Sequence, residues 1–314
     1  MAFEFGVFHE FSRSTGQTEA EAFAKAFAQV DDAERWGVDV IWLAELHFLP
    51  ERSVLSAPLL IAAAIASRTK RIKLGIAVQV LPLCHPLRLA EEVATLDHVS
   101  QGRLVFGVGR SGFARTYEAY GIPYGESKER FAEVLEVLKR SWADGHFSFD
   151  GQFYKYHNVA MVPKPLQKPH PALRIAASSA DTFPTIGAMG LPVFVAVRLG
   201  TLEELGPDIK AYREAYRAAD HPGNGQVYLR VPIYVGEDEK SARAPANGGP
   251  SADRRWAPLP TKKRCAGVNW SRGSRGCPLV ASCQAMYARI SPPRSATSSP
   301  SVSLLLMWMS STTI

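Results

Sequence analysis

A helix followed directly by a buried strand, in residues 84–112, is the feature that most constrains the fold. Apolar side chains recur there at helical spacing after Pro86, which suits the first turn of a helix. Gly102 predicts the end of this helix, and residues 104–108 form an apolar run between glycines, which is typical of a strand buried on both faces. The run leads into GRSG at 109–112, where small residues let a ligand approach the backbone and an arginine can meet its charge.

Units of the same kind lie on both sides of this segment. Seven apolar strands separated by helices require parallel pairing with right-handed crossovers. A doubly wound sheet would satisfy this, but so regular a repeat, with polar or glycine-rich residues after the strands, favours a (β/α)8 barrel of the TIM type. Strands are expected at 3–9, 38–43, 72–80, 104–108, 173–177, 193–197 and 226–235, and helices at 19–36, 54–67, 86–100, 127–142, after Ser179 and at 202–219.

The repeat is interrupted twice. Asp150-Gly151 between alternating residues predicts a β-hairpin, inserted before the fifth strand. After residue 240 an eighth strand and the last helices cannot be recognised, because residues 241–314 contain no Glu or Phe, 13 Ser and 8 Pro, without periodicity. We therefore expect an incomplete barrel domain at 1–240, with its last strand and helices lost or replaced. The tail at 241–314 is either the product of a shifted reading frame or a genuine basic low-complexity segment.

Charge and composition exclude several functions. The net charge of +6 comes from the tail, which holds ten Lys or Arg and one Asp, so residues 1–240 are mildly acidic and nucleic-acid binding is not expected. No apolar run is long enough to cross a membrane, and the start lacks a signal peptide's basic region, so we expect a cytoplasmic protein. The four cysteines lack zinc spacing and the histidines do not cluster on strand ends, so no metal site is predicted.

Seven motifs, in order along residues 3–240, resemble those of the bacterial luciferase-like flavin-dependent monooxygenases. The resemblance implies a (β/α)8 barrel with an insertion before strand five. It also implies reduced FMN as cofactor, usually supplied by a separate flavin reductase, and a homodimer formed through the second and third helices. A sister branch of the family uses the deazaflavin F420 instead. The motifs are WLAELHF (42–48), LGIAVQVLPLCHP (74–86), LDHVSQGRLVFGVGRSG (96–112), YGIPYGESKERF (120–131), FDGQFY (149–154), PKPLQKPHP (163–171) and ASSADT (177–182).

The resemblance also implies where the flavin binds. A strand end that opens a helix offers free N–H groups to an anion, and an arginine fork suits phosphate, so the residues themselves favour the same corner. The alternatives are an ordinary helix cap at the serines and a surface ion pair at the arginine. The resemblance implies that a cis peptide between Ile76 and Ala77 supports the flavin ring. It also implies that either Arg130 or Lys128 helps to bind the phosphate. The cofactor-binding residues are Ile76, Ala77, Gly109, Arg110, Arg130, Ser178, Ser179 and Thr182.

Glu45 and His47 are the candidate catalytic residues, at the end of the second strand. The luciferases carry a His-His pair here, and the first member, their catalytic base, matches Leu46, so light emission from aldehydes is not expected. A histidine that titrates near neutral pH can hold or shuttle a proton during the reaction of the flavin with O₂. The alternative for His47 is a purely structural hydrogen bond beneath the site.

The sequence therefore predicts an oxidoreductase, a flavin-dependent monooxygenase that uses reduced FMN and O₂ to oxygenate a small organic substrate. Two alternatives stay open. One is an F420-dependent dehydrogenase on the same barrel, which transfers a hydride without oxygen. The other is a non-catalytic or inactive flavin-binding barrel, because a barrel without its eighth strand would expose sheet edges.

Overall fold

Strands and helices alternate along the chain as the sequence pattern predicts. The structure is a computed structural model, and it describes residues 4–196, 202–233 and 305–311. The strands are β1 (Phe5–His9), β2 (Val40–Leu43), β3 (Lys73–Val80), β4 (Leu104–Gly109), β5 (Phe147–Asp150), β6 (Lys155–Val159), β7 (Ala172–Ala176), β8 (Val193–Ala196), β9 (Val227–Ile233) and β10 (Leu305–Ser311). The helices are α1 (Glu19–Arg35), α2 (Pro58–Arg68), α3 (Pro86–Val99), α4 (Ala114–Ala119), α5 (Ser127–Trp142), α6 (Thr182–Ala188) and α7 (Leu202–Ala218), with short 3₁₀ turns η1 (Leu81–Leu83) and η2 (Tyr124–Glu126).

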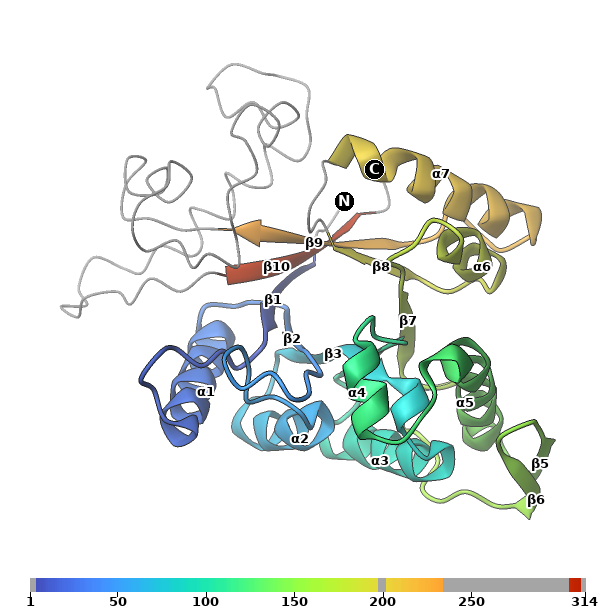
Figure 1. The fold of residues 1–314 in the computed structure, drawn as a ribbon, viewed down its shortest axis with the longest axis horizontal. Helices are drawn as coiled ribbons and strands as arrows, with labels where there is room; N and C mark the ends of the chain where they lie inside the picture. The colour runs from blue at the N-terminus through green and yellow to red at the C-terminus, as the bar shows by residue number, and fades with distance from the viewer. Residues whose placement is uncertain (1–3, 197–201, 234–304, 312–314) are drawn as a thin grey trace.

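Eight of these strands close into a barrel in the order β1-β10-β9-β8-β7-β4-β3-β2. The seven strands predicted from the sequence are all present and pair in parallel. Helices α1, α2, α3 and α5 lie outside the strands on one side, and α6 and α7 on the other (Figure 1). The predicted (β/α)8 type of barrel is confirmed.

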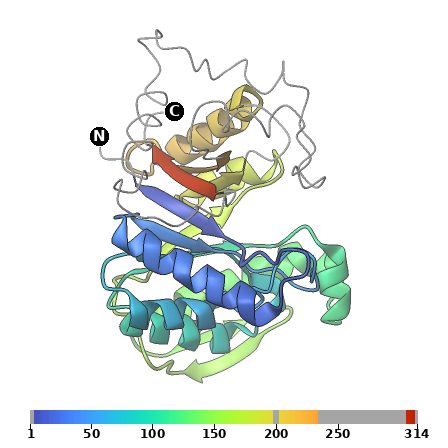
Figure 2. The same ribbon diagram turned by 90° about the vertical axis from the view of Figure 1, so that its left-hand side faces the viewer.

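The eighth position of the barrel is filled by β10, which the sequence does not predict. This strand lies between β9 and β1 and runs antiparallel to both, as the turned view shows (Figure 2). The expected parallel strand after residue 240 is thus replaced by the apolar run of the tail, and the backbone edges of β1 and β9 are paired. The rest of the expected tail, 241–304 and 312–314, lies outside the described residues.

The second helix starts later than the sequence predicts. The expected helix begins at residue 54, whereas α2 begins at Pro58, because proline lacks an N–H and suits the first helical turn. The backbone before it is used in the loop: the N–H of Val54 donates to the carbonyl of Phe11, and the carbonyl of Leu55 accepts from Leu46. These bonds fasten the segment after β2 to the barrel.

The predicted insertion before the fifth barrel strand is confirmed as the β5–β6 hairpin. Its turn is held by α5, because the carboxylate of Glu133 accepts from the N–H groups of Gln152, Phe153 and Tyr154 at 2.5, 3.0 and 3.2 Å. A Cβ at Gly151 would lie 2.4 Å from that carboxylate, so a side chain there would displace the Glu133 carboxylate from the turn.

Aromatic side chains fill the inside of the barrel. Trp42 lies over Gly6 and Gly75, where an added Cβ would come within 2.2 and 2.0 Å of the indole. Phe194 packs edge-on against Trp42, and the guanidinium carbon of Arg174 lies 5.1 Å from the centroid of the Trp42 ring. This filling leaves the C-terminal ends of the parallel strands as the place for a site. In the described ranges, no helix has the length and apolar character needed to cross a membrane.

Candidate active site

A β-bulge near the end of β3 shapes the inner surface of the site. Ile76 pairs with Phe106 and Gln79 with Val108, so Ala77 and Val78 together face the single residue Gly107. A Cβ on Gly107 would lie 2.2 Å from the backbone oxygen of Ile76, so the bulge requires glycine there.

The cis peptide next to this bulge is one residue away from its predicted place. It joins Ala77 to Val78, and the prediction of Ile76–Ala77 is wrong. The side chain of Ile76 is fully buried in the outer core, whereas Ala77 and Val78 are half-buried and pack against the cluster inside the barrel. Gly109 closes the same surface, because a Cβ there would lie 2.6 Å from Cγ2 of Val78. We call Leu46, Ala77, Val78, Gly109 and Ala176 the floor.

A buried carboxylate organises the polar side of the site. Oε2 of Glu45 accepts hydrogen bonds from the side-chain amide of Gln79 and from the backbone N–H of Val80, both at 2.7 Å. Its other oxygen lies 2.7 Å from Nε2 of His47, and the two side chains are 4% and 9% exposed. The sequence names Glu45 and His47 separately, and the structure joins them into one pair.

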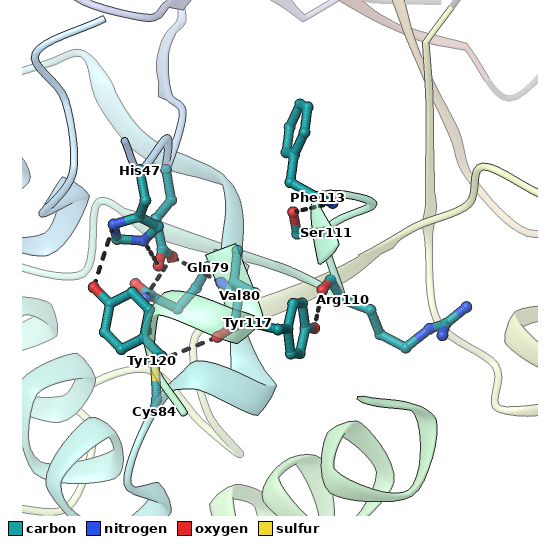
Figure 3. A network of polar contacts seen from close by, with 10 residues as sticks. His47, Gln79, Val80, Cys84, Arg110, Ser111, Phe113, Tyr117 and Tyr120 are labelled. Carbon is teal, nitrogen blue, oxygen red and sulfur yellow. Dashed lines mark hydrogen bonds and ion pairs between the residues drawn. The ribbon is translucent and has the colours of Figure 1, made fainter. Parts of the chain in front are cut away.

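Tyr120 lies on the far side of His47. Its hydroxyl is 3.3 Å from Nδ1 of the imidazole, and the two rings pack edge to face with centroids 5.3 Å apart (Figure 3). Tyr120 directly follows α4, and this short helix is fastened to the end of β2 because Arg115 donates to the backbone carbonyl of Phe48 at 2.7 Å. His47 is therefore held between a carboxylate and a phenol.

Cys84 joins this network through contacts with Gln79 and Val80. The Gln79 amide donates toward its sulfur at 3.5 Å, and the thiol donates to the carbonyl of Val80. Burial raises the pKa of the Cys84 thiol to about 12, and the Glu45 charge adds to the rise. The thiol therefore stays protonated and is not a nucleophile at neutral pH.

Cationic and hydroxyl groups gather at the ends of β4 and β7. These strands are neighbours, with Val108 opposite Ile175, so Arg110 and Ser178 both lie just past the paired residues. The pKa of Asp181 is lowered, first by a hydrogen bond from Ser179 and further by the charges of Lys128 and Arg110. We call Arg110, Lys128, Ser178, Ser179 and Thr182 the anion corner.

Two further contacts shape this anion corner. The hydroxyl of Ser179 lies 2.9 Å from that of Thr182, the first residue of α6. The guanidinium of Arg110 points away from His47 and Tyr120 (Figure 3) and reaches the Ser127 hydroxyl at 3.4 Å, while Tyr117 donates to the Arg110 carbonyl.

Arg130 is placed differently from Arg110. Its guanidinium makes two bonds, of 2.8 and 2.7 Å, to the carboxylate of Glu126 and lies 4.1 Å from the ring centroid of Phe153. The Glu126 carboxylate thus balances the charge of Arg130, and the guanidinium lies against Phe153 in the hairpin turn. Of the two cations offered as helpers at the phosphate, Lys128 is the one that acts on Asp181.

Comparison with known proteins places the chain in a family. A family model described as luciferase-like monooxygenase matches residues 3–275. The chain belongs to this family. The match confirms the resemblance on which the sequence predictions were based, and it extends past residue 240 into the tail.

Relatives of this luciferase-like chain include oxygenases and a deazaflavin enzyme. It is 28% identical over 249 residues, 77% of the chain and 68% of the relative, to the oxygenase component of a flavin-dependent trigonelline monooxygenase of Acinetobacter baylyi. It is 29% identical, over 72% of the chain and 66% of the relative, to an F420-dependent glucose-6-phosphate dehydrogenase of Kineococcus radiotolerans. The crystal structure of the monooxygenase RslO1 from Streptomyces bottropensis superposes with a TM-score of 0.73 at 26% identity, covering 82% of this chain and 79% of that one. The chain spans about half the length of several other curated relatives it matches.

The residues of this luciferase-like barrel fit a flavin mononucleotide. The floor is apolar, and Gly109 adds no side chain to it, because Val78 already occupies the space that a Cβ would need. The anion corner offers two cations and three hydroxyls beside it, and the Glu45–His47 pair lies at the other edge of the floor. A molecule with a flat apolar ring and a phosphate arm matches such a surface.

Five residues of the site are missed by the sequence analysis: Val78, Gln79, Tyr117, Tyr120 and Ala176. Gln79 carries a usable signal, because a polar residue in an otherwise apolar buried strand needs a hydrogen-bond partner. The two tyrosines lie in or beside α4, whose six residues are too few for a periodic pattern.

Proposed function

We propose that this chain is a flavin-dependent monooxygenase that binds reduced FMN across the C-terminal ends of the barrel strands and oxygenates a small organic substrate with O₂. The observation that carries the proposal is the anion corner: Arg110 and Ser178 follow the ends of two neighbouring strands, and the hydroxyls of Ser179 and Thr182 lie 2.9 Å apart beside them. Arg110 also reaches Ser127, the residue before Lys128. Two cations with hydroxyls at a helix start suit a phosphate, and the floor beside them suits a flat ring.

Each group then has a role. Arg110, Lys128, Ser178, Ser179 and Thr182 would hold the phosphate, and the floor would carry the ring. The flavin supplies the reaction with O₂, and the protein supplies orientation and a water-poor surface. His47, with Glu45 on Nε2, can accept or return a proton at Nδ1.

The test compares FMN with riboflavin, which lacks the phosphate. Flavin fluorescence is titrated against the purified full chain and its Arg110→Ala variant, with Arg88→Ala as control, since Arg88 pairs with Glu92 on the surface of α3. Losing a charge-assisted phosphate contact of ~1.5–3 kcal/mol should weaken FMN binding about 10- to 100-fold and leave riboflavin unchanged. A folded chain that binds no flavin, or an equal loss for both flavins, refutes the proposal.

Consumption of O₂ dependent on reduced FMN tests the chemistry. A chain that binds FMN but takes up no O₂ would instead be the non-catalytic barrel. The second candidate, an F420-dependent dehydrogenase, is favoured by the similarity to the Kineococcus enzyme. Titration with F420, and hydride transfer to it without oxygen, decides between the two cofactors.

We also propose two protein partners. A separate flavin reductase would deliver the reduced cofactor, as the name "oxygenase component" of the Acinetobacter relative suggests. A second copy of the chain would cover α2 and α3, where Leu60 is 72% and Val99 52% exposed. Light scattering of the wild type and of Leu60→Lys tests this: the dimer should weaken in the variant, and a monomeric wild type refutes it.

The division of the chain stays a proposal. We propose a barrel domain at 1–240, which β10 of the tail closes, and a tail at 241–314 that comes from a shifted reading frame, supported by the absence of Glu and Phe in the tail. Reading the coding sequence around codon 240 in all three frames tests it, and another frame that continues the family pattern is the expected result. The cytoplasmic location stays a prediction as well.

A further inference from the structure

The hydrogen bonds around Glu45 determine which nitrogen of His47 carries the proton. Oε2 of Glu45 already accepts from Gln79 and Val80, both at 2.7 Å, and these two donors stabilise a carboxylate. A carboxylate only accepts, so Nε2 of His47, 2.7 Å from Oε1, must be the donor. Neutral His47 therefore presents its lone pair at Nδ1.

The group that meets this lone pair is the hydroxyl of Tyr120, at 3.3 Å. Burial and the nearby Glu45 charge raise the pKa of Tyr120, so the phenol keeps its proton and donates. The side chains of Glu45 and His47 are only 4% and 9% exposed, whereas Tyr120 is 46% exposed and is thus the member of this network that water reaches.

We propose that Tyr120 is a positioning residue that fixes the His47 ring through Nδ1 and passes protons between that nitrogen and water. In the inward direction, a hydronium ion gives a proton to the phenol oxygen as the hydroxyl proton moves to Nδ1, which leaves water, an imidazolium and an unchanged phenol. The reverse sequence returns the proton to water. The use of this relay in oxygenation rests on the proposed function, whereas the relay itself does not.

The surroundings of Tyr120 support this role. Arg115 ties α4 to the carbonyl of Phe48 at 2.7 Å, and the ring of Phe48 lies 5.9 Å from that of Tyr120. Contacts with Phe48 thus hold both the start of α4, through Arg115, and the Tyr120 ring that follows it. Tyr117, one turn earlier in α4, donates to the carbonyl of Arg110 instead. The two tyrosines therefore contact different parts of the site: Tyr117 the Arg110 backbone and Tyr120 the His47 side chain.

The experiment uses Tyr120→Phe, which keeps the ring and removes the hydroxyl. The matched control is Tyr124→Phe, because Tyr124 is also exposed and packs on Tyr117 rather than on His47. In the flavin-free full chain labelled with ¹⁵N-histidine, NMR should show His47 protonated at Nε2 in all three proteins. The Nδ1 resonance should move to higher frequency in Tyr120→Phe alone, because the nitrogen loses its donor.

Proton exchange gives the second flavin-free measurement. At a pH where His47 is half protonated, exchange of its Nδ1 proton with water should slow about tenfold in Tyr120→Phe and stay unchanged in Tyr124→Phe. An unmoved Nδ1 resonance or unchanged exchange overturns the proposal. Either result is independent of whether the chain oxygenates anything.

In the flavin-loaded enzyme, the same variant should lower kcat about tenfold with KM unchanged, and added imidazole should restore the rate by carrying the proton. A loss of rate that imidazole does not restore indicates a merely structural tyrosine and overturns the relay. If no protein turns over while the NMR results hold, the proposed function fails and the relay stands.

Discussion

Replacing Glu45 tests the arrangement of the site, because this carboxylate joins Gln79, Val80 and His47. In Glu45→Ala, the N–H of Val80, the amide of Gln79 and Nε2 of His47 lose an acceptor 2.7 Å away, all at buried positions. A buried donor without a partner costs ~1–3 kcal/mol, so the three together should lower the free energy of unfolding by about 3–9 kcal/mol. That is a large part of the total of about 5–15 kcal/mol for a typical protein.

Glu45→Gln should separate stability from chemistry. Its carbonyl can still accept from Gln79 and Val80, so the loss of charge assistance should cost only ~2 kcal/mol. Its amide then donates to Nε2 of His47, which forces the imidazole proton onto Nδ1 and removes the base that faces Tyr120. A histidine in the wrong tautomer should lower kcat by about 100-fold or more.

Urea unfolding and ¹⁵N-histidine NMR read the two effects separately. The expected order of stability is wild type, Glu45→Gln, Glu45→Ala, with the tautomer inverted in the glutamine variant. The reasoning is refuted if Glu45→Ala lies within ~1 kcal/mol of the wild type. It is refuted equally if Glu45→Gln keeps the proton on Nε2.

Three further predictions concern the floor, the anion corner and acid stability. Gly107→Ala should destabilise the chain by ~2 kcal/mol or more and weaken flavin binding, because its Cβ would lie 2.2 Å from the Ile76 carbonyl oxygen, and thermal unfolding with FMN titration measures both. Asp181→Asn should tighten FMN binding several-fold but not riboflavin binding, since a carboxylate repels the phosphate. Burial lowers the pKa of His9 from 6.5 to about 4, so stability is full above pH 6.5 and falls by up to ~3 kcal/mol as the pH drops to 4; urea unfolding at several pH values should show this slope, and His9→Asn should flatten it.

The parts of the fold that local patterns encode could be predicted. Each parallel strand is a short apolar run, and each is present, because such a run must be buried on both faces wherever helices cover the sheet. The hairpin follows from Asp150-Gly151 for the same local reason. Pro58 carried the information for the true start of α2, since proline belongs in a first helical turn and the residues before it pair with a distant loop.

Contacts between distant segments could not be predicted. The antiparallel strand β10 pairs with β1 from the opposite end of the chain, and a lone apolar run does not state its partner. The cis peptide was placed one residue early, because the two-against-one pairing at Gly107 depends on the register between β3 and β4. The link from His47 to Tyr120 joins residues 73 positions apart.

The leucine at position 46 bears on the direction of the proposed proton route. Leu46 is half-buried and packs with Ala77, Val78 and Ala176 on the cluster inside the barrel, so this position belongs to the apolar floor. The remaining histidine is held by Glu45 with its free nitrogen toward Tyr120. An apolar floor offers no group to exchange protons beneath a bound ring. Among the residues that the structure describes, the edge that His47 and Tyr120 form is therefore the route we propose for protons, and removing one phenolic oxygen should slow turnover without weakening flavin binding.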